Sequence, residues 1–91
     1  MHAVVVNVSI EAGHEADAAE RLQTDVLPRV KEAPGLVCGN WLVPSEGKGF
    51  SLVVFESEAA AKAMVEGMSS MPWPDFIKLD KVEVREVAAH I

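Results

Sequence analysis

Cysteine is almost absent from this chain, and the single one, Cys38, leaves no disulfide framework to hold a fold together. One unpaired cysteine is typical of a protein kept in a reducing compartment. Long apolar runs are missing as well, because Asn7 and Ser9 interrupt the N-terminal one and no basic segment precedes it. This run is too short for a signal peptide or a membrane-spanning helix. We therefore expect a cytoplasmic protein.

Positive charge is scarce, with 8 lysines and arginines against 14 aspartates and glutamates and a formal net charge of −6. The basic residues are scattered along the chain and form no stripe. Nucleic acid requires such a stripe, and an anionic membrane surface also requires clustered basic residues. The sequence thus predicts neither a nucleic-acid partner nor a membrane partner.

The usual elements of metal and nucleophilic chemistry are also missing. His2 and His90 could approach each other if the first and last strands pair, but no third ligand accompanies them, so we expect no metal site. Cys38 has no neighbouring base in sequence, which gives no indication of a nucleophile. The glycines of "EGKG" join two predicted strands and open no helix, so they form no phosphate-binding loop.

Hydrophobic residues are abundant, at 49% of the 91 residues, and we expect one domain over residues 1–91. A chain of this length buries only about 60–65% of its unfolded surface, so its own core is thin. A second copy of the chain is the simplest way to complete that core. The composition therefore favours a homodimer.

The hydrophobic pattern predicts two helices and four strands. Pro28 should kink the first helix, which Pro34 and Gly35 then end, and Ser57 should cap the second. The resulting order βαββαβ is the ferredoxin-like α+β arrangement, an antiparallel four-stranded sheet with two helices on one face. The expected elements are strands Val4–Ile10, Leu36–Val43, Phe50–Glu56 and Ile77–Val87, and helices Ala16–Ala33 and Glu58–Ser70.

The sheet face without helices should also be apolar. If the hairpin pairs Trp41 with Val53, one set of apolar side chains gathers on that face, and two copies packed sheet to sheet would cover it. This set comprises Leu36, Cys38, Leu42, Phe50, Leu52 and Val54.

Two segments carry a resemblance to a known family: "LPRVKEAPGLVCGNW" (Leu27–Trp41) and "LVVFESEAAAKAM" (Leu52–Met64). Together with the element order they resemble the antibiotic biosynthesis monooxygenase-like group of the dimeric α+β-barrel superfamily. The resemblance implies a dimeric α+β barrel with a cavity under the helices. Its members include cofactor-independent oxygenases of aromatic polyketides and haem-degrading enzymes.

The functional residues of these members match this chain only in part. Quinone-forming members bear an asparagine and a tryptophan near the end of the third strand, where this chain has Ser51 and Phe55. Haem-degrading members bear a first-strand asparagine, which Asn7 matches, together with a histidine ligand that is absent here. Trp73 falls in their tryptophan-bearing segment but out of place. The resemblance therefore does not favour haem degradation.

The predicted substrate-binding cavity is lined by aromatic, methionine and small polar residues that suit a flat apolar ligand. Ordinary core packing is the alternative reading of the same residues. The tryptophan pinned between two prolines is a lid over the cavity or a plug that fills it. The asparagine is either a satisfied structural residue or a ligand donor. The candidate residues are Asn7, Trp41, Ser51, Phe55, Met64, Met68 and Trp73.

By resemblance, the function is that of a cofactor-independent monooxygenase of a small aromatic or polyketide-like substrate. Such an enzyme forms a substrate anion that reacts with oxygen, while the protein buries, orients and stabilises that anion. None of the polar cavity candidates is a general base at neutral pH. The alternative is a non-catalytic module that binds a small apolar ligand or only dimerises.

Overall fold

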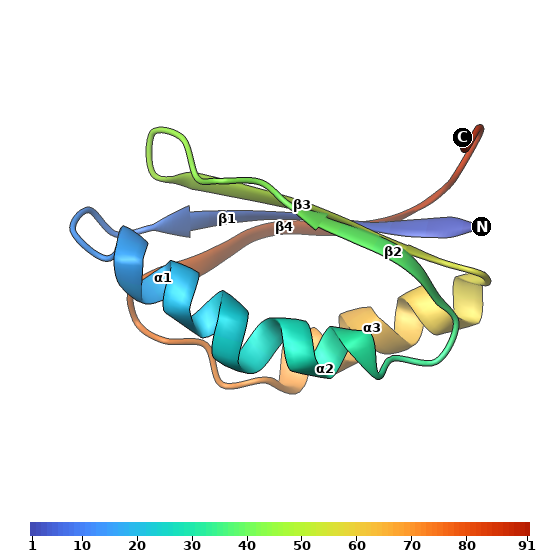
Figure 1. Ribbon diagram of the computed structural model, residues 1–91, viewed down its shortest axis with the longest axis horizontal. Helices are drawn as coiled ribbons and strands as arrows, with labels where there is room; N and C mark the ends of the chain where they lie inside the picture. The colour runs from blue at the N-terminus through green and yellow to red at the C-terminus, as the bar shows by residue number, and fades with distance from the viewer.

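A four-stranded antiparallel sheet carries all the helices on one of its faces (Figure 1). The computed structural model describes residues 1–91, and its strands stand in the order β2-β3-β1-β4. The predicted ferredoxin-like βαββαβ fold is confirmed. The strands are β1 (His2–Ile10), β2 (Leu36–Trp41), β3 (Lys48–Phe55) and β4 (Ile77–Glu86); the helical segments are α1 (Glu15–Arg21), η1 (Leu22–Val26), α2 (Leu27–Lys31) and α3 (Glu58–Ser70).

The two central strands, β1 and β3, fix which side chains face the helices. Val4 pairs with Val53, and both side chains are fully buried. Since side chains alternate along a strand, the even positions of β1 and the odd positions of β3 point under the helices. We call this the inner face of the sheet and the opposite one the outer face.

The first helix contains a widened turn at the place where the proline was expected to disturb it. Segment η1 is a π-helix, and the Leu27 backbone N–H donates to the carbonyl of Leu22 five residues earlier. In a regular α-helix the Pro28 ring would clash with the Thr24 carbonyl. The wider turn gives that ring room, and α2 continues beyond it to Lys31. None of the helices is both long enough and apolar enough to cross a membrane.

The β2–β3 hairpin has a register two residues away from the predicted one. Trp41 pairs with Ser51, and Gly39 pairs with Val53. The chain reverses at Glu46 and Gly47, whose φ angles of 52° and 75° give a turn with two left-handed residues, the type that matches strand twist. A shift of two residues keeps every side chain on its predicted face, because the strand period is two.

The core beneath the sheet is small, since only 12 of the 91 residues are buried. Phe55 is fully buried at its centre, where Met68 of α3 and Val30 of α2 join it. Few buried residues mean a modest stability margin for a single chain. The thin core that the composition predicted is present.

The outer face is less apolar than expected. Leu36 packs against the inner core instead, because the pairing of β2 with β3 shifts between Leu36 and Cys38. Val54 lies on the outer face but is only 4% exposed within the single chain. Leu42 and Phe50 were also expected there, but both border the space between the sheet and the helices. Along β4 the outer positions are charged rather than apolar, at Lys81, Glu83 and Arg85.

Helix α3 begins with the predicted side-chain cap. The hydroxyl oxygen of Ser57 accepts a hydrogen bond of 3.2 Å from the backbone N–H of Ala60. This bond satisfies one of the N–H groups that have no partner in the first turn of a helix.

Removing this cap should destabilise the fold measurably. We expect Ser57→Ala to lower the free energy of unfolding by about 1 kcal/mol, the usual contribution of a serine N-cap. Urea titration followed by circular dichroism measures the change. Ser70→Ala is the matched control, because the Ser70 hydroxyl only bonds to carbonyls of its own helix. Equal effects of both substitutions would contradict the capping role.

Candidate functional site

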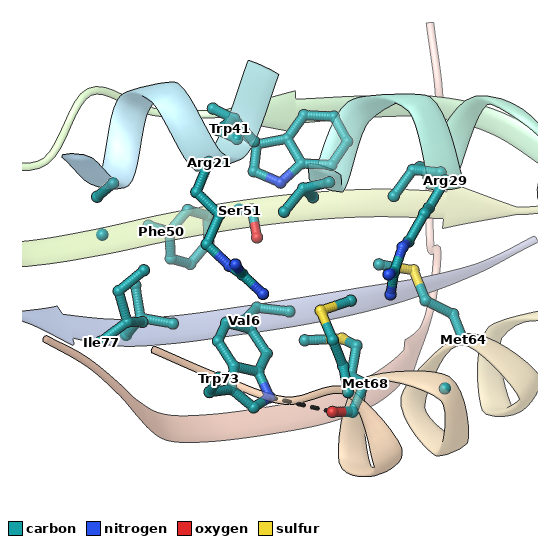
Figure 2. Close-up of a pocket in the computed structure, with 18 of the residues that line it drawn as sticks. Val6, Arg21, Arg29, Trp41, Phe50, Ser51, Met64, Met68, Trp73 and Ile77 are labelled. Atoms are coloured by element: carbon teal, nitrogen blue, oxygen red, sulfur yellow. Dashed lines mark hydrogen bonds between the residues drawn. The ribbon is translucent and has the colours of Figure 1, made fainter. Parts of the chain in front are cut away.

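A cavity of about 730 Å³ lies between the inner face of the sheet and the helices (Figure 2). Of the 28 residues that line it, 20 are hydrophobic. This volume is within the usual range for small-molecule sites, about 300–1,000 Å³. Its walls come from β1, from the whole first helix, from the β2–β3 hairpin and from α3, so residues distant in sequence meet here.

Five of the seven predicted site residues line this cavity: Trp41, Ser51, Met64, Met68 and Trp73. Their side chains are drawn together in Figure 2, with the hydroxyl of Ser51 beside the indole of Trp41. The predicted sharing of one face by Trp41 and Ser51 is confirmed by their direct pairing. Phe55 faces the same side but is fully buried in the core, so it does not reach the cavity.

Asn7 does not lie in the cavity. The cavity-lining residues of β1 are Val6, Val8 and Ile10, and Asn7 stands between the first two on the outer face. It pairs with Phe50 and Lys81 and remains partly exposed. The expectation that it points under the helices is wrong, because strand alternation turns it away. Its match to the haem-degrading asparagine therefore concerns sequence position only.

Trp73 is a fixed part of the cavity wall. Its indole N–H donates a hydrogen bond of 3.0 Å to the carbonyl of Met68, near the end of α3 (Figure 2). The preceding carbonyl, that of Pro72, accepts a bond of 2.8 Å from the guanidinium of Arg21. These two bonds join the connection before β4 to both helices.

Sequence reasoning missed two arginines that line the cavity, Arg21 and Arg29. Each stands one residue before an apolar residue that also lines it, Leu22 and Val30 respectively. The apolar stripe predicts which side of the helix is buried, and charged residues beside such a stripe are usually exposed to water. Figure 2 shows both side chains extending from the first helix over the cavity.

The chemistry available in the cavity is narrow. Its lining contains no histidine, cysteine, aspartate, glutamate or lysine, so no side chain there can act as a general base at neutral pH. Its polar side chains are the two arginines, Gln23, Ser51 and the two indoles. The walls can bury, orient and electrostatically stabilise a ligand, but cannot take a proton from it.

The structure brings no group of three or more metal-ligating side chains together. His2 lies on the inner face near the start of α3, with its Nε2 atom 3.8 Å from a carboxylate oxygen of Glu58. His90 lies beyond the end of β4 and is exposed.

Comparison with known proteins places this architecture among solved structures of the same fold. No protein-family model matches the chain, and neither does any curated protein sequence. MhuD, a heme-degrader from Mycobacterium tuberculosis with two hemes bound in its active site, gives a TM-score of 0.76 at 16% identity, over 100% of this chain and 99% of that one. A protein of unknown function from Nitrosomonas europaea gives 0.71 at 20% identity, over 99% and 91% of the two chains.

A monooxygenase from Streptomyces coelicolor, the product of ActVA-Orf6 in complex with the ligand Nanaomycin D, gives a TM-score of 0.63 at 17% identity. The match covers 99% of this chain and 89% of that chain. Identities this low establish the fold. The chain therefore has the fold of the antibiotic biosynthesis monooxygenase-like group, as the sequence resemblance predicted.

Gly39 leaves the space that the Trp41 indole occupies on the cavity wall. A Cβ atom at this position would stand 2.7 Å from an indole carbon of Trp41, which is closer than van der Waals contact allows. We expect Gly39→Ala to displace the indole and to destabilise the fold by about 1–3 kcal/mol.

The displacement can be measured by fluorescence in a Trp73→Phe background, where Trp41 is the only tryptophan. Its emission should shift to longer wavelength, and acrylamide should quench it faster. Gly67→Ala is the control, because a Cβ atom there meets nothing within 4 Å. Unchanged Trp41 emission in the Gly39 variant would contradict this packing.

Proposed function

We propose that this protein binds a small aromatic or polyketide-like molecule in the cavity between sheet and helices and oxidises it as a cofactor-independent monooxygenase. The observation that supports this proposal best is the large apolar cavity, whose lining includes Ser51 and two arginines. A similar fold is seen in complex with the ligand Nanaomycin D in the Streptomyces coelicolor monooxygenase.

The reaction that suits such a cavity begins with a substrate acidic enough to ionise without a protein base. A CH₂ group between two aromatic rings loses a proton to solvent, and the resulting anion combines with oxygen. The product is a ketone, and the balance is R₂CH₂ + O₂ → R₂C=O + H₂O. The protein's part is to hold the flat anion away from water and to stabilise its charge.

Haem degradation is not part of this proposal, although MhuD has a similar fold and binds heme. Iron ligands in haem proteins are imidazole, thiolate, thioether or phenolate side chains. The cavity offers no histidine, cysteine or tyrosine, and the thioethers of Met64, Met68 and Met71 are the only such groups in it. The apolar lining suits a planar apolar ligand, whereas the side chains present are poor ligands for haem iron.

A second function, binding without turnover, is favoured by the absence of any base in the cavity lining. The two functions separate in an oxygen electrode with anthrone as the probe. A monooxygenase consumes one O₂ per anthraquinone formed, whereas a binding module only retains the probe. Native mass spectrometry of the purified protein reports retention directly.

Blocking the cavity should weaken binding and slow oxygen consumption. Ala18 of α1 lines the cavity and Ala16 of the same helix does not. We expect Ala18→Trp to weaken anthrone binding and slow oxygen uptake by at least about tenfold, a loss of about 1.4 kcal/mol. Ala16→Trp, the same change outside the cavity, should leave both unchanged. Equal activity of the two variants would place the site elsewhere.

The proposed functional unit is a homodimer joined through the outer faces of two sheets. Val5 and Leu52 present apolar side chains there, and the core of one chain is thin, with 12 buried residues. Asn7 lies on the same face and makes no side-chain hydrogen bond within the chain, so a partner or solvent must satisfy its amide.

A charge at the centre of this face should separate the subunits. We expect Leu52→Lys to shift the protein from dimer to monomer in sedimentation equilibrium at micromolar concentration, because an unpaired charge is costly to bury. Val43→Lys is the control, since Val43 is 90% exposed and lies in the connection between β2 and β3, at the edge of the cavity. A wild-type protein that sediments as a folded monomer would refute the dimer.

A further inference from the structure

The cavity lining differs in charge from the protein as a whole. The chain has 14 acidic and 8 basic residues, yet no acidic residue lines the cavity and two of the basic ones do. A protein with a formal net charge of −6 repels anions at long range. Its cavity nevertheless presents only positive charge to whatever enters it.

The two arginines differ in the number of contacts that their guanidinium groups make within the chain. The guanidinium of Arg21 lies 3.1 Å from a carboxylate oxygen of Asp25 and donates to the Pro72 carbonyl at 2.8 Å. Arg29 makes neither a side-chain hydrogen bond nor an ion pair within the chain. An arginine carries five N–H donors in a planar fork, so those of Arg29 are all available to a ligand or to water.

A second polar group without a partner within the chain lies on the sheet side of the same cavity. Ser51 is 7% exposed, lines the cavity and makes no side-chain hydrogen bond within the chain. Its hydroxyl group borders the cavity, so it is available to a ligand or to water. In Figure 2 Ser51 lies on the sheet, whereas Arg29 extends from the helix, so the two polar groups come from different walls of the cavity.

We propose that the ligand is a flat aromatic acid bound as its anion, with the charged oxygen at Arg29 and a hydrogen-bonding oxygen at Ser51. This assignment rests on the proposed function, since it names the substrate class of that same cavity. Trp41 and Met64 supply the apolar surfaces for the rings. Carboxylates and phenolates both fit, because a guanidinium pairs with either oxygen anion.

The same observations disfavour other ligand charges. A cationic ligand would meet two guanidinium groups and no carboxylate from the cavity lining. A ligand with several negative charges would find only one guanidinium without a partner. A neutral hydrocarbon would leave both Arg29 and Ser51 without a ligand contact. A singly charged aromatic acid can pair its anion with Arg29 and form a hydrogen bond with Ser51, so both polar groups gain a partner.

Two fluorescent probes of the same size test this assignment: anthracenecarboxylate and its neutral counterpart anthracenemethanol. Dissociation constants are measured at physiological ionic strength, which screens charges beyond about 8 Å. We expect the wild-type protein to prefer the carboxylate. Arg29→Gln should weaken carboxylate binding about fivefold, roughly 1 kcal/mol for an ion pair at an exposed side chain, and leave binding of the alcohol unchanged.

Lys31→Gln is the matched control, because it removes one positive charge from the same helix outside this cavity. It should alter neither constant. Equal carboxylate affinity in wild type and Arg29→Gln, or an equal loss in Lys31→Gln, would overturn the role of Arg29 while leaving the cavity proposal standing. Failure of the wild-type protein to bind either probe would overturn the cavity proposal and this assignment together.

Discussion

The direction of the side chains on the two central strands is the constraint on which the rest of the structure depends. Val4 and Val53 face each other across the β1–β3 ladder and are both fully buried under the helices. Because alternation leaves no freedom after that, Ser51 must also face inward and Asn7 must face outward. The cavity wall and the outer face are therefore two consequences of one pairing.

Much of this arrangement was predictable from the sequence, and the failures have physical causes. The element order follows from the hydrophobic periodicity and the turn residues. The face of Asn7 could have been predicted as well, because the even positions from Val4 to Ile10 are all apolar, whereas Asn7 shares the odd face with Ser9. The resemblance to the haem-degrading members favoured the wrong face. The inward position of Leu36 could not be read, since the shift in pairing near Cys38 depends on tertiary contacts.

The arginines escaped prediction for a different reason, which lies in the π turn. Residues 21 and 29 are eight apart, which in a regular α-helix leaves them about 80° past two full turns. A π turn contains more residues per turn, so it takes up part of that excess. The segment Leu22–Val26 lies between the two arginines, and both line the same cavity. The helix disturbance near Pro28 thus contributes to the site rather than only tolerating a proline.

Because the cavity lining contains no general base, its ligand must lose a proton without help from a side chain of the lining. The only ionisable side chains in the lining are arginines, which keep their charge throughout the physiological pH range. The charge that the protein presents is therefore constant, and any pH dependence of binding has to come from ionisation of the ligand. A permanent positive charge favours the ionised ligand, and the apolar walls shield its rings from water, whereas Arg29 itself is exposed. An oxygenase without a base requires the same two conditions, because its substrate must be an anion before oxygen can react. Recognition of an aromatic acid and activation of an acidic carbon would therefore use one set of residues.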